Sequence, residues 1–393
     1  MNKNTLKRST VTRNMLGKWI SVALLSAFAA AACAQSDPSA RAENATPPAQ
    51  PAQTAKAAPP AEAVPATTTQ TSSIPTADMP ATTEGMAATQ TVATMPPPQP
   101  AMPAAVDVSE QAGIAKDSLL RAQILLDRAH FSPGEIDGAG GSNTRKAIAA
   151  FQRYEDLPDN GELDAATWAA LDAGGAALVN YTLTSDDVAG PFNAVPAGMA
   201  AKAKLDKLGY ASVEEALGEK FHASPALLKK LNPDKDMATA GTELVVPNVM
   251  DVAAPAKAAK VVVDKSDLTV SLVDAADKVY AQFPASTGSK NDPLPIGEWK
   301  INGVAMNPVF NYNPKLFWDA NPKDAKAKIP AGPNNPVGTV WVDLSKEHYG
   351  IHGTPEPSRI SKSESHGCIR LTNWTASMLA KAVAPGMPAI LQE

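Results

Sequence analysis

The sequence predicts a multidomain protein in which a long disordered N-terminal linker precedes three folded parts. These parts are a three-helix domain, a small α+β module and a C-terminal, mainly antiparallel β-sandwich. The 393 residues are enough for more than one domain. Prolines number 35, about 9% of the chain against about 5% in an average protein, and aromatic residues make up only 5%. A segment poor in aromatic residues and rich in Ala, Pro and Thr therefore dilutes ordinary globular parts.

Charge and cysteine content exclude several classes of protein. The formal net charge is −5, and basic residues cluster only at the extreme N-terminus, which argues against nucleic acid as a partner. The two cysteines, Cys33 and Cys368, are too few for a disulfide-rich scaffold or a four-cysteine zinc site. Because their sequence surroundings differ, we expect them to have unrelated roles.

Residues 1–33 are organised like a secretory signal peptide. Five basic residues precede the first acidic residue, and an apolar run from Trp19 to Ala32 ends in small residues. That run is shorter than the about 20 residues that a membrane-spanning helix needs. We therefore expect an exported protein of the cell envelope.

The residues before Cys33 resemble a bacterial lipobox, in which the cysteine is acylated and becomes the new N-terminus. Ala30 stands where a lipobox usually has Leu, and ordinary cleavage after Ala34 is the alternative. Loss of residues 1–32 removes five positive charges and leaves a net charge near −10, so acyl chains rather than charge would hold the protein at a membrane. The lipobox interpretation predicts a periplasmic protein that is anchored to a membrane through lipidated Cys33.

Residues 34–106 are expected to form a disordered Ala/Pro/Thr linker. They contain no Phe, Trp or Tyr up to residue 105, and Ile74 is the one Ile or Leu in that stretch. Such a segment cannot bury enough apolar surface to offset its conformational entropy. Fully extended, it would reach on the order of 200 Å, which suits a spacer between an anchored end and the folded parts.

Residues 107–175 predict a three-helix domain. Apolar residues at helical spacing are followed by a Pro-Gly turn, an Ile-Asp-Gly turn at 136–138 and two further helical segments that end near Leu171. The order and spacing of these motifs resemble the peptidoglycan-binding domain of cell-wall proteins. That resemblance implies a non-catalytic wall anchor, with Asp137 in a turn and Phe151 in the core rather than at a ligand.

Residues 176–256 predict a small α+β module and a connector. Two short helical segments, an Asn-Pro turn at 232–233 and a closing Leu-Val-Val-Pro strand at 244–247 resemble a LysM glycan-binding module. The opening strand of that module is not evident, although the stretch from Tyr181 to Asp187 is a candidate for it. The alternative is a helical connector between two domains.

The pattern changes to short β-prone runs from residue 257 to the C-terminus. Runs rich in Val, Leu, Ile, Trp and Tyr are separated by Asp, Ser and Ala turns. They occur at 261–263, 268–273, 279–283, 297–301, 338–342 and 349–352. A mostly antiparallel sandwich with long loops is the fold that such runs favour.

Two histidines accompany Cys368 in this β-rich part. His352 ends the last β-prone run, and His366 lies two residues before the cysteine in a Ser-His-Gly-Cys sequence. A cysteine nucleophile needs a base and local donors for the oxyanion, which this set can supply. As alternatives, Cys368 is a small buried hydrophobe in a non-catalytic wall-binding protein, or His348 and His352 bind zinc in a murein hydrolase. The glutamate of the helical zinc motif is missing.

The ordered motifs over residues 258–393 resemble the YkuD-type L,D-transpeptidases. The resemblance implies that Cys368 is the nucleophile, His352 the base and the Gly353 carbonyl the group that orients the base. It places His366 and the backbone N–H groups of Gly367 and Cys368 at the oxyanion site. It implies neither a cofactor nor a metal.

Candidate substrate-binding residues are Arg370, Ser365, Asn335 and Trp318, the last two from a Pro- and Asn-rich loop at 305–335 that is a candidate lid. Arg370 would grip a substrate carboxylate or brace its own loop. The resemblance implies a thioester with the third stem-peptide residue of peptidoglycan, release of D-alanine and a 3→3 cross-link to a second stem. A lipoprotein lysine, a free D-amino acid and water are the alternative acceptors. The expected partners are thus stem peptides, glycan strands and a membrane.

Overall fold

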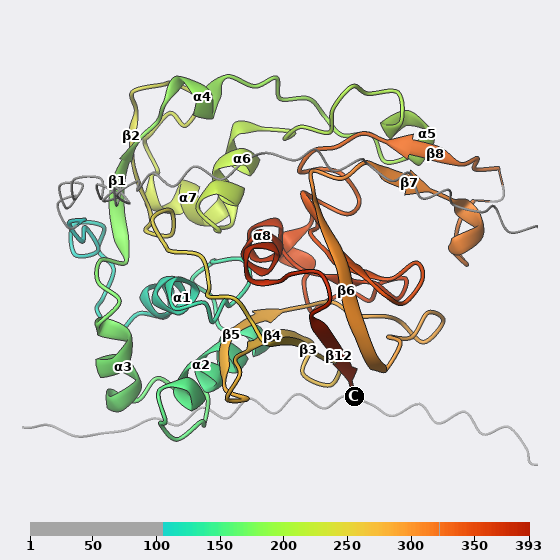
Figure 1. The fold of residues 1–393 in the computed structure, drawn as a ribbon. Helices are drawn as coiled ribbons and strands as arrows, with labels where there is room; N and C mark the ends of the chain where they lie inside the picture. The colour runs from blue at the N-terminus through green and yellow to red at the C-terminus, as the bar shows by residue number, and fades with distance from the viewer. Residues whose placement is uncertain (1–104, 322) are drawn as a thin grey trace, which may run out of the picture. The chain divides into compact units, whose positions relative to one another are not determined.

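The computed structural model describes residues 105–393 except residue 322 (Figure 1). The expected signal peptide, Cys33 and all but the last two residues of the expected linker lie outside the described residues. Within the described part of the chain, no helix has both the length and the apolar character needed to cross a bilayer.

A helical region comes first, with α1 (Leu119–Arg128), α2 (Ser142–Tyr154) and α3 (Ala165–Asp172). The Ser118 side chain accepts a hydrogen bond from the Arg121 N–H at the start of α1, and Asp164 does the same for Thr167 at the start of α3. Each cap stabilises its helix by about 1 kcal/mol. The predicted order of helices and turns is therefore present between residues 107 and 175.

Two buried glutamines hold the turns between these helices. The Gln123 amide donates to Asp137 Oδ1 and to the Ala139 carbonyl, and its oxygen accepts from the Gly138 N–H at 2.7 Å. Gln152 holds the turn between α2 and α3 in the same way: its side-chain oxygen accepts a hydrogen bond from the Gly161 N–H at 2.8 Å. Asp137 is thus a turn residue, as predicted.

A βααβ unit follows. β1 (Leu178–Thr182) pairs antiparallel with β2 (Glu243–Pro247), and α6 (Val213–Lys220) and α7 (Pro225–Leu231) lie between them in sequence. Serines cap both helices: Ser212 accepts from Glu215 and Ser224 from Leu227. The opening strand, for which Tyr181–Asp187 was the candidate, begins earlier, at Leu178. Two short helices also lie here: α4 (Ser185–Val188) and α5 (Met199–Lys202).

One hydrophobic core serves both the helical region and the βααβ unit. Buried residues from α1 and α2, such as Leu126 and Phe151, belong to the same cluster as Leu178 of β1 and Leu217 of α6. The β-rich part has a core of its own, centred on the buried faces of its strands and on α8 (Asn373–Ala382). The described residues therefore bury two large apolar clusters, and the boundary between them falls after the βααβ unit.

Apart from one two-stranded hairpin, the strands of the β-rich part form a single eight-stranded sheet with the order β11-β10-β9-β6-β12-β3-β4-β5. Its strands are β3 (Lys260–Asp264), β4 (Thr269–Val273), β5 (Val279–Pro284), β6 (Gly297–Met306), β9 (Val340–Leu344), β10 (Gly350–His352), β11 (Ile369–Arg370) and β12 (Pro388–Gln392). Most neighbours are antiparallel, as predicted, and the β10–β11 and β12–β3 pairs are parallel. The predicted sandwich of two sheets is replaced by this single sheet.

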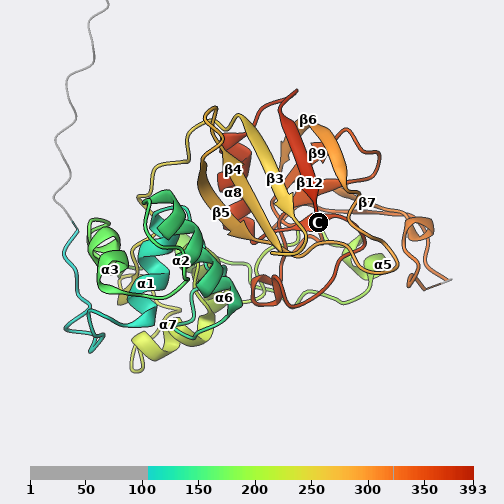
Figure 2. The same ribbon diagram turned by 90° about the horizontal axis from the view of Figure 1, so that it is seen from below.

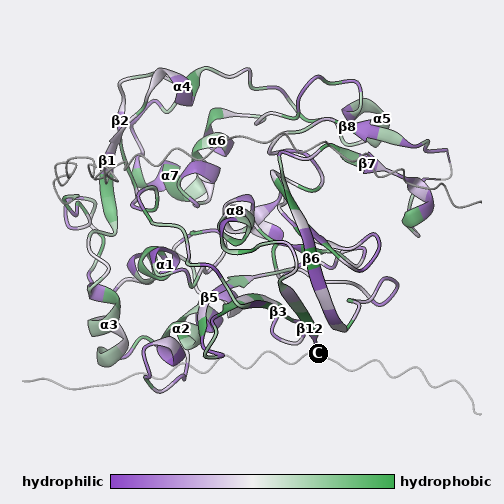
Figure 3. Cartoon of the chain, in the orientation of Figure 1, coloured by the Kyte–Doolittle hydropathy of each residue, from purple (hydrophilic) through white to green (hydrophobic). Residues whose placement is uncertain are grey.

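Strand β6 pairs with strands on both of its sides and so joins the β-rich part into one sheet instead of two. Its first residues, Gly297–Lys300, pair with β12, and its later residues pair with β9 (Figure 2). The register shifts between Ile301 and Gly303, and such a bulge bends a strand and increases its twist. Polar residues recur along β6, and most of its C-terminal half is exposed (Figure 3).

Connections around the sheet complete the fold. A hairpin of β7 (Phe310–Tyr312) and β8 (Ala327–Ile329) lies within the predicted lid loop, with the short helix η1 (Pro314–Leu316) between its strands. A second short helix, η2 (Pro357–Arg359), lies between β10 and β11. Helix α8 packs against β10, the neighbour of β11 in the sheet, and against β9, the next strand along.

Candidate active site

Cys368 and His352 lie at the edge of the sheet where β10 and β11 run parallel. Ile351 is opposite Ile369 and His352 is opposite Arg370. Both isoleucines are fully buried in the core. Because side chains alternate along a strand, the His352 side chain lies on the face opposite to Ile351, and Cys368 directly precedes β11.

His352 is buried, and two neighbours fix its ring. Its Nδ1 lies 2.7 Å from the carbonyl oxygen of Gly353, which can only accept a hydrogen bond. Nδ1 therefore carries the proton, and Nε2 is left with a free lone pair. Trp341, its partner on β9, stacks on the imidazole at 5.6 Å between ring centroids and 18° between planes. Burial lowers the pKa of His352 to about 4; the Gly353 hydrogen bond opposes this shift and nearby Arg370 adds to it.

The Cys368 thiol is free and partly exposed. Its Sγ donates to the carbonyl oxygen of His348 at 3.6 Å. Burial raises the pKa of the Cys368 thiol to about 11, and a backbone hydrogen bond from Gly350 opposes the rise. At neutral pH the site therefore holds an un-ionised thiol and a neutral imidazole. Such a pair suits proton transfer during nucleophilic attack, because the neutral ring can accept a proton.

The turn that carries Cys368 is held by close packing. Gly367 has φ +95°, and a Cβ there would lie 2.6 Å from Cε1 of Tyr349, so both backbone conformation and space require glycine. His366 turns outward, where its Nε2 lies 2.8 Å from Asp319 Oδ1. Phe317 packs edge-on against the imidazole at 5.1 Å. The segment between η1 and β8 thus contacts the cysteine loop directly.

Comparison with known proteins agrees with this geometry. The L,D-transpeptidase catalytic domain matches residues 258–391, which include the whole site, and a peptidoglycan-binding domain matches residues 116–171. The L,D-transpeptidase YkuD of Bacillus subtilis is 32% identical over 167 residues, which cover 42% of this chain and 85% of that protein. The chain belongs to the L,D-transpeptidase family. The resemblance predicted from the sequence is thereby confirmed.

Other relatives carry the same family name. The L,D-transpeptidase YbiS of Escherichia coli is 26% identical over 130 residues, and the match covers 32% of this chain and 42% of that protein. Among solved structures, an L,D-transpeptidase from Mycobacterium smegmatis is 20% identical, with a TM-score of 0.28. The match covers 40% of this chain and 76% of that chain.

Three of the four candidate substrate-binding residues of this L,D-transpeptidase form hydrogen bonds with other residues of the chain. Arg370 Nη2 donates to the Ser363 carbonyl at 2.9 Å and to the Glu364 carbonyl, a geometry that favours the bracing role. Ser365 donates its hydroxyl to the Cys368 carbonyl oxygen. Asn335 is fully buried and donates to the Pro330 carbonyl at 2.8 Å. Trp318, in contrast, is 62% exposed and lies beside His366.

Four residues that contact the site were not predicted. Trp341 stacks on His352, Tyr349 packs on Gly367, Asp319 binds His366, and Asn373 packs on Gly353. Trp341 lies opposite His352 in the register of β9 and β10, so with that register known the alternation of side chains along β9 would have placed Trp341 on the same face as His352. The other three come from loops and a helix start, for which the sequence carries no spacing signal.

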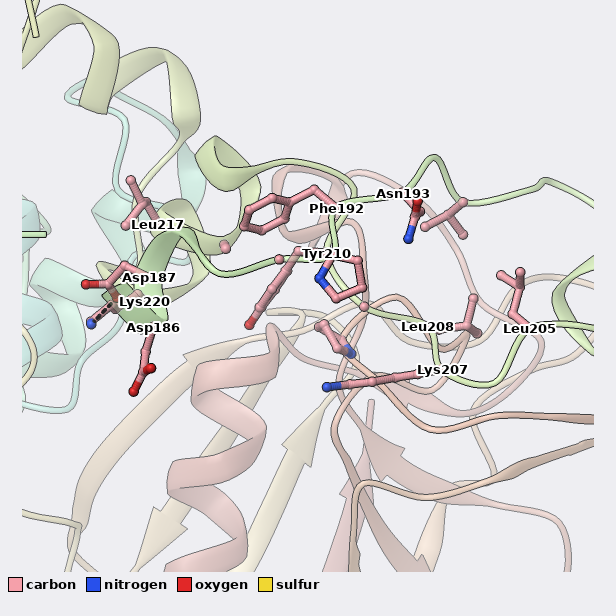
Figure 4. Close-up of a pocket in the computed structure, with 16 residues that line it drawn as sticks. Asp186, Asp187, Phe192, Asn193, Leu205, Lys207, Leu208, Tyr210, Leu217 and Lys220 are labelled. Carbon is pink, nitrogen blue, oxygen red and sulfur yellow. Dashed lines mark hydrogen bonds and ion pairs between the residues drawn. The ribbon is translucent and has the colours of Figure 1, made fainter. Parts of the chain in front are cut away.

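A separate hollow of about 660 Å³ lies away from the cysteine site (Figure 4). Phe192 and Tyr210 line it, together with Lys220, which forms an ion pair with Asp187 at 2.6 Å. It shares no residue with the Cys368 site. Across the described part of the chain, no three His, Cys, Asp or Glu side chains gather in a way that would hold a metal ion.

Proposed function

We propose that this protein is a cysteine acyltransferase that acts on peptidoglycan stem peptides and forms 3→3 cross-links. Cys368 would be the acyl carrier and His352 its base. The observation that supports the proposal is the parallel pairing of β10 and β11: His352 ends the first strand and the free Cys368 directly precedes the second. Family membership supplies the class of reaction.

In the first half-reaction, His352 Nε2 takes the proton of the Cys368 thiol as the sulfur attacks the carbonyl of the third stem residue. Rotation of the thiol away from the His348 carbonyl precedes this step, since Sγ donates to that oxygen in the resting site. The C–N bond to D-alanine then breaks, and the leaving amine takes the proton from His352. A thioester remains on Cys368.

In the second half-reaction, the side-chain amine of another stem attacks the thioester and gives a proton to His352. The C–S bond breaks, an amide forms, and the sulfur takes back the proton. The N–H groups of Gly367 and Cys368 would stabilise the oxyanion in both halves. One well-placed donor of this kind lowers a barrier by about 3–4 kcal/mol.

The remaining parts of the chain fit wall attachment. The matched peptidoglycan-binding domain supports binding of the wall by residues 107–175. The βααβ order of the next unit supports a LysM-like glycan-binding module. We further propose export by residues 1–33 and a lipid anchor at Cys33 in the periplasm, from which residues 34–106 extend as a spacer.

Incubation with tetrapeptide muropeptides, followed by mass spectrometry of the products, tests the proposal. Wild type should release D-alanine and form cross-linked dimers, whereas Cys368→Ala should do neither. Tripeptides would identify water as the acceptor, and exchanged D-amino acids or a lipoprotein-linked stem would identify the other acceptors. Turnover by Cys368→Ala equal to wild type would overturn the proposal; sensitivity to a chelator in that variant would favour zinc chemistry.

A further inference from the structure

Asn373, the first residue of α8, is wedged against the backbone beside His352. A Cβ at Gly338 would lie 2.0 Å from Asn373 Oδ1, and one at Gly353 would lie 2.2 Å from the same atom. Oδ1 also accepts the N–H of Thr339 at 3.1 Å. Because Gly353 carries the carbonyl that holds His352 Nδ1, the Asn373 amide supports the peptide that orients the catalytic imidazole.

The other end of the Asn373 amide is held from outside the catalytic domain. Its Nδ2 donates to Oε1 of Glu219 at 3.0 Å and to the Pro333 carbonyl at 3.3 Å. The Thr339 N–H can only donate and the Pro333 carbonyl can only accept, so these partners assign the amide oxygen and nitrogen without ambiguity. Glu219 must therefore act as an acceptor. It lies 154 residues earlier in the chain, in α6 of the βααβ unit.

Glu219 lies among acidic and phenolic groups. Glu215 is one turn earlier on α6, Glu135 comes from the turn before α2, and Tyr210 comes from the segment before α6. Lys362 lies near Glu135, and Lys220 follows Glu219 in sequence but binds Asp187. Burial raises the pKa of the Glu219 carboxyl to about 8; the Asn373 hydrogen bond opposes the rise, and Glu215 and Glu135 add to it. At neutral pH the carboxyl is mostly protonated and still accepts through one oxygen.

We infer that Glu219 is a positioning residue for His352 and acts through Asn373 and Gly353. The βααβ unit thus contributes a group to the support of the catalytic base, and its seating on the catalytic domain is coupled to acyl transfer. The catalytic part of this inference rests on the proposed function. The hydrogen bond from Asn373 favours the ionised form of Glu219, so the acceptor is kept when the carboxyl ionises and the positioning role holds on both sides of the Glu219 pKa.

Three variants of the full chain test the inference through kcat and KM for a tetrapeptide donor between pH 6 and 9.5. Glu219→Ala removes the acceptor and should lower kcat by about ten- to a hundredfold with little change in KM, because the base is displaced. Glu219→Gln keeps an acceptor of the same shape, so it should retain the wild-type kcat across this pH range. Glu214→Ala, on an exposed neighbour in α6, should match wild type.

A second readout does not depend on turnover. The Nδ1 proton of His352, followed by NMR in 15N-histidine-labelled protein, reports the hydrogen bond to Gly353. It should be lost or shifted in Glu219→Ala and retained in Glu219→Gln. If wild type and Cys368→Ala are equally inactive but this signal behaves as expected, the proposed function fails and the positioning role stands.

The inference is overturned if Glu219→Ala keeps the wild-type kcat and the wild-type His352 signal. It is also overturned if folded Glu219→Gln, which keeps the acceptor, loses both the wild-type kcat and the His352 signal. The second result decides the matter even if Glu219→Ala does not fold, because the glutamine variant preserves shape and hydrogen bonding.

Discussion

Cys368 and His352 have pKa values that burial moves apart, to about 11 for the thiol and about 4 for the imidazole. The resting site is therefore neutral, unlike a cysteine site that stores a thiolate beside an imidazolium. Deprotonation then has to accompany attack on the substrate, and the orientation of His352 matters more than its charge. The Gly353 carbonyl and the Trp341 ring provide that orientation.

Alkylation kinetics should reveal this neutral thiol. The thiolate is the reactive form, so the rate of iodoacetamide reaction with Cys368 should be low at pH 7 and should keep rising toward pH 11. In denatured protein the rate should level off near the ordinary thiol pKa of about 8.5. Mass spectrometry of the Cys368 peptide measures the rate, and a plateau below pH 8 in the folded protein would contradict the neutral pair.

Arg370 shows how far one residue's role depends on its surroundings. The sequence allowed two roles, a grip on a substrate carboxylate and a brace for its own loop. Its Nη2 donates hydrogen bonds to the carbonyl oxygens of Ser363 and Glu364, and these bonds correspond to the brace. The guanidinium thereby holds the turn that leads into Ser365 and the nucleophile.

At the scale of elements, the packing of α6 links the stability of the protein to pH through Glu219. The pKa of Glu219 is raised from an ordinary value near 4.5 to about 8, so the folded state binds a proton that the unfolded state releases between these values. The associated stability is fully present below about pH 4.5 and is lost as the pH rises through about 8. Ionised Glu219 is the form that burial disfavours.

Glu219→Gln should remove this part of the pH dependence. The variant cannot ionise, so its free energy of unfolding relative to wild type should increase between pH 5 and pH 9. Chemical denaturation at a series of pH values, with Glu214→Gln as the exposed control, measures the difference. Parallel stability curves for wild type and Glu219→Gln would contradict the raised pKa.

For the whole molecule, the core shared by the helical region and the βααβ unit predicts how stable fragments of the chain will be. Leu178, Leu217 and Phe221 are buried in the same cluster as Leu126 and Phe151. A fragment of residues 105–175 loses these partners, and each large apolar side chain left exposed forfeits about 1.5–3 kcal/mol. The fragment should therefore be far less stable than residues 105–256.

Circular dichroism on the two fragments checks this expectation. Residues 105–256 should unfold cooperatively, while residues 105–175 should show a broad transition at lower temperature. Equal Tm values for the two fragments would mean that the helical region is independent. The predicted boundary at 175–176 would then mark two separately folding domains.

Local patterns predicted much of this protein. The Ile-Asp-Gly turn and most of the β-prone runs have short-range physical causes, and they appear where the sequence placed them. The pairing of β6 with both β9 and β12 has no such cause. It depends on a bulge near Gly303 and on contacts between distant strands. The sequence therefore predicted a sandwich where the structure has one main sheet.

The sequence by itself determined the family and named the candidate chemical groups, because Ser-His-Gly-Cys and the Ile-His-Gly-Thr run before it are each short motifs in a β-rich stretch. Only the tertiary structure decided what supports them. Asn373, Asp319 and Glu219 lie in a helix start, a loop and another unit, and long-range packing alone brings them to the site. Such contacts leave no periodicity in a single sequence, since their partners lie tens to more than a hundred residues apart.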